Sequence, residues 1–552
     1  MNMCSSLSEA LNKAKTTHNY LLSFLFFLFL VFLFRFAGLS DRPMHGDEAN
    51  QAVRTGQLLE QGVYHYDPAD HHGPVLYYAA IPFCRATTSR FAETTEYNFR
   101  LVPVVFSLLT LLLIAGCYRR DKTGLFRSPF TAWIAVVVVA VSPAMNYYSR
   151  FFIQESMFVT FLTGILVSAI HYVRAISSRE KLLWAGGVGV FTGLAVSTKE
   201  TVVLSLAAAL FAGLATLATR GLKTFRETWS WRDACVVICC AGFVDVLFYS
   251  SFFTYPQGVY DELFSTVKTY MTRATAVPEH HHPWNFYLQF LFGWQYGRGP
   301  VWREINYWFL LPLVIAVVTP VVECLRLNRQ DETLYARLMR ARWTLFVVLY
   351  TLILTALYAC IPYKTPWCIL SFLFGYLVLV ARGFEYVIEF LIPTRSTLLF
   401  TLATRIAIVL VVVACCLGIR HNCLRSKDAC FKYAADIRNP YVYAHTGRDA
   451  LDLVAAIERA AKEKAGQGMY DVPIAIVSPP SDYWPLPFYL RKFNAVGYWS
   501  TVDEIPPAFK PHLMIISASM GDQASRIMGK EAQSNFFGIR PGTLLLFFER
   551  KQ

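Results

Sequence analysis

The sequence predicts a polytopic α-helical membrane protein with about 11 transmembrane helices and a small C-terminal α/β domain. Hydrophobic residues make up 55% of the 552 residues and charged residues only 16%, where an ordinary soluble domain has about 25%. Long apolar windows recur as far as residue 419, and the pattern then changes to alternating helices and strands. This composition excludes a disordered chain and a soluble nucleic-acid-binding protein, despite a formal net charge of +13.

The predicted spans are apolar windows of about 20 residues, the length that crosses the hydrocarbon core as a helix. They are residues 20–39, 101–118, 132–148, 155–173, 184–198, 201–219, 234–254, 306–325, 343–361, 367–392 and 398–419. The first window follows Lys13 and Lys15 and has no small-residue cleavage site. We therefore interpret it as an uncleaved anchor rather than a signal peptide.

The distribution of Lys and Arg predicts the orientation in the membrane. With the N-terminus in the cytoplasm, basic residues gather in the loops on the inside, as the positive-inside rule requires. These loops are residues 119–127, 174–181, 220–232 and 326–342, with Arg395. An odd number of spans then places the C-terminal domain outside. We expect a multi-pass protein of the cell (plasma) membrane that contacts membrane lipids and no nucleic acid.

The domain organisation follows from the lengths of the outer segments. Residues 1–420 form the predicted membrane domain, whose outer loops 40–100 and 255–305 are too long for turns and suit short interfacial helices. Residues 421–552 form the predicted extracytoplasmic domain. Its expected elements are helices over 448–464, near 484–491 and near 523–530, and strands over 473–477, 495–499, 513–517 and 543–548.

The densest polar cluster, residues 45–48, follows the first span and contains His45, Asp47 and Glu48. Two adjacent carboxylates at the outer membrane boundary are suited to proton abstraction or to metal binding. The ordinary alternative is that Asp47 caps a surface helix. A second polar run brings His71 and His72 before Pro74, where a plain loop leading into a helix is an equal alternative.

The outer turns between spans carry the other candidate residues. Arg150 and Glu155 lie in the second turn, Lys199 in the third, and Tyr363 and Lys364 in the last. Each has an ordinary alternative in the helix dipole, in snorkelling or in the interfacial aromatic belt. Charges within the spans are few, and the concentration of polar residues at one face favours an interfacial enzyme over a transporter.

Two further patterns have less weight. The consecutive histidines His280, His281 and His282 point in different directions, so a loop is favoured over a zinc site. Cys423 and Cys430 lie just outside the last span, where an oxidising compartment permits a disulfide, and their spacing leaves that pairing open.

In the order of these features, the sequence resembles the GT-C superfamily of membrane glycosyltransferases. The shared pattern is one span, an outer loop opening with residues 45–48 (HGDE), the 71–74 stretch (HHGP), a short outer loop with Arg150 and Glu155, and an outer C-terminal domain. It is similar to protein O-mannosyltransferases and aminoarabinose transferases. More narrowly, residues 363–367 (YKTPW) and 484–487 (WPLP) resemble the prokaryotic family called flippase-activity-associated in N-glycosylation gene clusters.

This resemblance implies a GT-C-like enzyme that transfers a sugar, with inversion, from a polyprenyl-phosphate-linked donor to a glycan, lipid or protein acceptor at the outer face. It assigns the catalytic carboxylate to Asp47 or Glu48. It assigns acceptor or metal binding to Glu155, His45, His71 and His72, and donor-phosphate binding to Lys364, Arg150, Lys199 and Tyr363.

The sequence lacks an Asp-x-Asp in the second outer loop and a Trp-Trp-Asp in the tail, both typical of metal-dependent oligosaccharyl transferases. No cofactor is therefore assigned, and the need for a divalent cation stays open. The alternative function is a flippase of lipid-linked sugars or its accessory protein, which predicts a hydrated groove with polar residues along a span.

Overall fold

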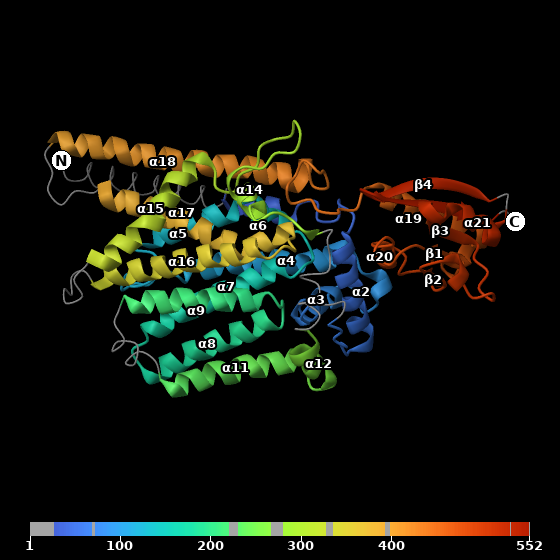
Figure 1. The fold of residues 1–552 in the computed structure, drawn as a ribbon, viewed down its shortest axis with the longest axis horizontal. Helices are drawn as coiled ribbons and strands as arrows, with labels where there is room; N and C mark the ends of the chain where they lie inside the picture. The colour runs from blue at the N-terminus through green and yellow to red at the C-terminus, as the bar shows by residue number, and fades with distance from the viewer. Residues whose placement is uncertain are drawn as a thin grey trace, which may run out of the picture.

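The computed structural model describes residues 27–68, 72–219, 230–266, 280–326, 335–391, 398–529 and 532–550. These residues form a long bundle of helices with a small α/β domain at one end (Figure 1). The predicted polytopic helical fold with a C-terminal α/β domain is thereby confirmed.

A helix lies at each of the predicted spans. The helices are Phe27–Phe36, α4 (Glu96–Ala115), α5 (Pro129–Ala140) with α6 (Pro143–Tyr148), α7 (Glu155–Val173), α8 (Ser178–Val196), α9 (Val202–Ala218), α11 (Trp231–Tyr249), α15 (Tyr307–Arg326), α16 (Tyr335–Cys360), α17 (Leu370–Leu391) and α18 (Leu398–Lys427). Among the described residues, 6 helices are long and apolar enough to cross a membrane by length and composition. The predicted number of spans is reached only by including shorter or less apolar helices such as Phe27–Phe36, α5 and α9.

The third predicted span is broken into α5 and α6. Ser142 accepts a hydrogen bond from the Met145 N–H and so caps α6, while Pro143 stands at its first position, where a proline costs no backbone hydrogen bond. All six residues of α6 are buried. The break directs Tyr147 and Tyr148 into the packed outer end of the bundle.

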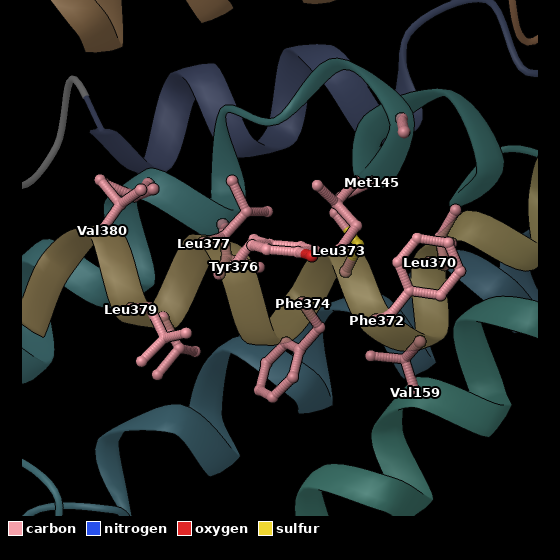
Figure 2. Packing of buried hydrophobic residues seen from close by; sticks show 14 of the residues in the cluster. Met145, Val159, Leu370, Phe372, Leu373, Phe374, Tyr376, Leu377, Leu379 and Val380 are labelled. Carbon is pink, nitrogen blue, oxygen red and sulfur yellow. The ribbon is translucent and has the colours of Figure 1, made fainter. Parts of the chain in front are cut away.

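Helix α17 forms the centre of the bundle, because its residues from Leu370 to Tyr386 are all buried. Figure 2 shows its aromatic and aliphatic side chains packed among neighbouring helices, with Met145 and Val159 close by. Helix α15 approaches so closely that a Cβ atom added to Gly383 would lie 1.8 Å from the Pro312 carbonyl oxygen. By contrast, α18 exposes apolar side chains along its length, as a helix facing lipid does.

Short helices form a layer over the end of the bundle that carries the C-terminal domain, which is the end predicted to lie outside and is called the outer end below. They are α2 (Gly46–Gln61), α3 (Val75–Arg85), the 3₁₀ turn Phe91–Glu93, α12 (Gln257–Tyr260), the π-helical turn Asp261–Thr266 and α14 (Phe286–Phe292). Helix α2 packs on α3, and α3 packs on α4. The outer loops therefore form a layer at the predicted outer membrane boundary.

The C-terminal domain is a five-stranded sheet with helices. Its elements are α19 (Asp449–Ala465), β1 (Ile474–Val477), α20 (Leu486–Tyr489), β2 (Val496–Trp499), β3 (Leu513–Ser517), α21 (Gly521–Met528), β4 (Gln533–Arg540) and β5 (Thr543–Glu549). The strand order is β2-β1-β3-β5-β4, with β1 parallel to β2 and β3, and β5 antiparallel to β3 and β4. Every expected element of this domain is present, and β4 was not predicted.

The C-terminal domain packs directly on the outer layer. Helix α20 contacts α2, and the Tyr489 hydroxyl accepts a hydrogen bond of 2.9 Å from the Met44 N–H. The Thr446 hydroxyl donates to the Met44 carbonyl at 2.7 Å. Helix α18 continues to Lys427, beyond the predicted domain boundary at residue 420. The segment before α2 is thus held from both the bundle and the C-terminal domain.

Candidate functional site

The adjacent carboxylates of Asp47 and Glu48 lie in very different surroundings. The Glu48 side chain is 0% exposed and accepts two hydrogen bonds of 2.8 Å from Arg100 and one of 3.1 Å from Arg42. The His45 and Phe152 N–H groups also donate to it, at 3.1 and 3.0 Å. Both carboxylate oxygens of Glu48 are therefore occupied.

These contacts decide the charge of Glu48. Burial alone would raise its pKa, but the guanidiniums of Arg100 and Arg42 outweigh burial and hold the pKa of Glu48 well below its ordinary value. The carboxylate stays ionised and its lone pairs stay bonded. This geometry makes Glu48 an anchor that joins α2 to α4 and to the turn before α7.

Asp47 differs because its side chain is 51% exposed. The N-cap of α2 is His45 rather than Asp47: the His45 Nδ1 accepts a hydrogen bond of 3.0 Å from the Asp47 N–H, and Glu48 completes a capping box. The ordinary alternative considered for Asp47 is thus wrong. Its carboxylate stands in the first turn of α2, half-exposed, with one oxygen 3.8 Å from the His45 Nδ1.

An aromatic wall lies beside the start of α2. The His45 ring lies 5.3 Å from the Phe151 ring and 6.0 Å from the Trp367 ring, between centroids. Arg42 stacks on Phe151 at 4.4 Å. His445, from the segment between α18 and α19, lies 5.1 Å from His45, and burial lowers its pKa well below the ordinary value. The imidazole of His445 is therefore neutral at this contact.

The last outer turn meets this wall through Trp367. Lys364 is buried, and its ammonium donates to backbone carbonyls of His282, at 3.1 Å, and of Ile361. Burial lowers the pKa of Lys364. Tyr363 packs against His280 with ring centroids 4.8 Å apart. The turn thus connects the outer loop over residues 255–305 to the start of α2.

Glu155 and Lys199 form a buried ion pair. The Lys199 ammonium also contacts the Cys368 sulfur at 3.6 Å. Because Cys368 follows Trp367, this ion pair and the start of α2 lie on either side of the same turn. Residues 367–368 thus lie between the Glu155–Lys199 ion pair and His45, which stands two residues before Asp47.

Arg150 and His72 each bind partners other than Asp47 and Glu155. Arg150 donates to the Phe34 and Gly38 carbonyls at 3.2 and 2.9 Å, which ties it to the end of the first helix rather than to Glu155. His72 bonds Glu200 at 2.8 Å. His71 lies outside the described residues.

No ligand set for a metal can be assigned. Within the described ranges, no group of three or more His, Cys, Asp or Glu side chains is placed to hold a metal ion. The described Cys423 and Cys430 are both free thiols.

An apolar groove of about 570 Å³ lies below the outer layer, on the membrane side. Its lining comes from α3, α4, α7, α8 and α11, and includes Tyr78, Phe106, Phe161 and Phe248, with Arg85 at its edge. Aromatic and aliphatic walls of this kind suit a hydrocarbon chain.

Several residues of the site were not predicted. Arg42 and Arg100, which hold Glu48, come from different segments, and no local motif marks them. Tyr443 and His445 are contributed by the chain after α18, and the Tyr443 carbonyl contacts the His45 Nε2 at 2.9 Å. The only available signal was that Arg100 stands near the start of an apolar span, where an unpaired cation is costly.

Comparisons with known proteins agree with the fold described above. Residues 77–260 match the model of the dolichyl-phosphate-mannose-protein mannosyltransferase family. No curated protein matches the chain in sequence. ArnT from Cupriavidus metallidurans, in a crystal structure bound to undecaprenyl phosphate, matches with a TM-score of 0.60 and 13% identity over 95% of this chain and 97% of that one.

A second solved structure has the same fold. The oligosaccharyltransferase of Archaeoglobus fulgidus, tethered with an acceptor peptide, matches with a TM-score of 0.51 and 10% identity over 96% of this chain and 73% of that one. At these identities the likeness establishes the fold. With the family match, it confirms the prediction of a membrane glycosyltransferase of the GT-C superfamily. The narrower resemblance to the flippase-activity-associated family stays a prediction.

Proposed function

We propose that this GT-C membrane glycosyltransferase moves a sugar from a polyprenyl-phosphate donor to an acceptor hydroxyl or amide at the outer face of the plasma membrane. The N-terminus would lie in the cytoplasm and the C-terminal domain outside. The difference between Asp47 and Glu48 is the observation that supports this proposal most. An enzyme of this kind needs a carboxylate with free lone pairs, held rigidly at the membrane boundary.

Asp47 is the proposed base. Its carboxylate takes the proton from the acceptor while the acceptor atom bonds to the anomeric carbon. The bond from that carbon to the phosphate oxygen breaks, and the polyprenyl phosphate leaves with the electron pair. Attack from the face opposite the leaving phosphate inverts the anomeric centre. Glu48 is a positioning residue, because it holds the first turn of α2 through Arg100 and Arg42.

The donor would lie with its chain in the apolar groove and its phosphate at the outer turns. Lys199, Tyr363 and His72 are the proposed phosphate contacts, since cations and hydroxyl groups stabilise charge that develops on a leaving phosphate. The groove is lined by α3, and His72 stands just before that helix. The match of ArnT in its undecaprenyl-phosphate complex supports a donor of this class.

The acceptor would approach from the C-terminal domain. A Cβ atom added to Gly46, the residue before Asp47, would lie 3.4 Å from the Trp484 Cβ. The 484–487 segment therefore covers the start of α2. This placement suits a domain that presents the acceptor to Asp47.

The test is donor turnover by purified protein in nanodiscs, with a panel of labelled polyprenyl-phosphate sugars and an envelope extract as acceptor. Asp47→Asn should lower kcat by about 10²–10⁴-fold, the usual contribution of a general base, with an unchanged melting temperature. Asp503→Asn is the matched control, since Asp503 is an exposed aspartate of the C-terminal domain. Full turnover by Asp47→Asn would remove the proposed base. In sealed proteoliposomes, donor translocation without release of polyprenyl phosphate would favour the flippase alternative.

A further inference from the structure

A second cavity, of about 540 Å³, lies at the outer end of the bundle. It is bounded by four parts of the chain: residues 38–43 after the first helix, Arg100 of α4, the end of α6 with Arg150, and the segment 430–448 that leads from α18 to the C-terminal domain. It shares no lining residue with the apolar groove. The proposed reaction assigns no role to this cavity.

The inner wall of the cavity carries three arginines, Arg42, Arg100 and Arg150. All three are largely buried, and their guanidiniums are fixed by carbonyl and carboxylate partners. Arg100, for example, donates to the Leu39 carbonyl at 2.5 Å. Of these partners, only Glu48 carries a full negative charge, and Arg42 and Arg100 share it. The inner wall therefore keeps an excess of positive charge.

The rim adds two exposed cations, Lys432 and Arg448. Neither has a carboxylate within ion-pair distance in the described part of the chain. The rim aspartate Asp436 is already paired with Arg438 at 2.5 Å. Asp41 is the remaining acidic residue of the lining. The Lys432 ammonium lies over the Tyr433 ring, 5.0 Å from its centroid. A cavity with such a lining attracts an anion, and the two exposed cations at its rim are placed to contact one.

The position of the cavity indicates where the anion comes from. Its lining begins two residues after the helix Phe27–Phe36, on which Phe29 and Phe32 are exposed. Phe431, which follows α18, is 39% exposed and belongs to the lining. These apolar surfaces suit lipid chains, and they end where the cations begin. A lipid lying along them would bring its headgroup to the cavity.

We propose that this cavity binds the phosphate of a membrane lipid headgroup, with Lys432 and Arg448 as its cationic ligands. The group that the cavity would recognise is a phosphate mono- or diester. A free phosphate ion is the alternative source of this group. The inference is independent of sugar transfer, because none of the proposed donor contacts lines the cavity. A bound lipid would join the first helix, α6 and the C-terminal domain at one point.

The test is calorimetric titration of the purified full-length protein, in uncharged detergent, with three probes. These are dihexanoylphosphatidic acid, dihexanoylglycerol and inorganic phosphate. The variant is Lys432→Gln with Arg448→Gln. Its matched control is Lys462→Gln with Lys492→Gln, which removes two exposed cations of the C-terminal domain away from the cavity. Melting temperatures verify that both variants are folded.

The parent should bind the phosphatidic acid saturably. The Lys432→Gln/Arg448→Gln variant should bind it about tenfold more weakly, or weaker still, for each cation removed, because a hydrogen bond to a charged group is worth about 1.5–3 kcal/mol. The control pair should bind as the parent does, and dihexanoylglycerol should not bind at this site. Inorganic phosphate binding as tightly as the lipid would overturn the lipid source. Equal losses in the two variants, or no saturable binding by the parent, would overturn the site.

Discussion

Replacing Glu48 by Gln tests the central distinction between the two acidic neighbours. The substitution preserves the shape of the side chain but removes the charge that Arg100 and Arg42 share, in surroundings where Glu48 is 0% and Arg100 1% exposed. The new amide also turns a donor toward N–H groups that need an acceptor. Removing one partner of a buried ion pair costs about 3–5 kcal/mol. We expect Glu48→Gln to lose that much stability.

The assay is thermal unfolding in detergent, followed by tryptophan fluorescence and paired with donor turnover. Asp47→Asn should keep the melting temperature and lose turnover, whereas Glu48→Gln should lower both. A Glu48→Gln/Arg100→Met double variant should lose less than the sum of the single losses, since each single variant leaves an unpaired buried group. If Glu48→Gln unfolds like the parent and yet loses turnover, Glu48 is the base and the reasoning fails.

Three further predictions concern stability. Lys199→Met should cost about 3–5 kcal/mol by leaving Glu155 buried without its partner, and the Lys199→Met/Glu155→Leu pair should cost less in the same unfolding assay. Burial, followed by neighbouring carboxylates, raises the pKa of Glu262 to about 7 from 4.5. As the pH rises, the unfolded chain loses the Glu262 proton before the folded protein does, so stability falls between about pH 4.5 and 7. In Glu262→Gln the melting temperature should therefore change less between pH 5 and 8 than in the parent. Gly383→Ala should destabilise the protein, because the added Cβ atom would collide with the closely packed α15. In Gly242→Ala the added Cβ atom would meet no neighbouring helix within 4 Å, so this variant should be neutral or more stable by up to about 1 kcal/mol. Equal melting temperatures for the two variants would contradict this packing.

The helices were predictable because each one is a continuous apolar run, and such a run needs no knowledge of its neighbours. The break between α5 and α6 was missed because Pro143 stands inside an apolar window. Strand β4 was missed for a different reason. Residues 533–540 (QSNFFGIR) have no regular alternation, and their pairing with β5 at the edge of the sheet decides their conformation.

Single candidate residues of the site can be named from the sequence, but their contacts cannot. Asp47, Glu155 and Lys199 were identified from their positions at the ends of spans. No sequence pattern indicates that Glu155 pairs with Lys199 while Arg150 binds carbonyls at the end of the first helix. Such pairings depend on which hairpins lie side by side, and that is a property of the packed bundle.

The two adjacent carboxylates are chemically alike, and the helix geometry divides their roles. Successive residues of a helix point about 100° apart, so a helix lying on a bundle directs one of two neighbours inward and the other outward. The inward Glu48 meets Arg100 from α4 and the N–H of Phe152, and this fixes the rotation of α2 about its axis. That rotation in turn sets where the outward Asp47 stands. A base is effective only within hydrogen-bond reach of the proton it removes. The contacts of Glu48 therefore set the position from which the proposed base, Asp47, would act.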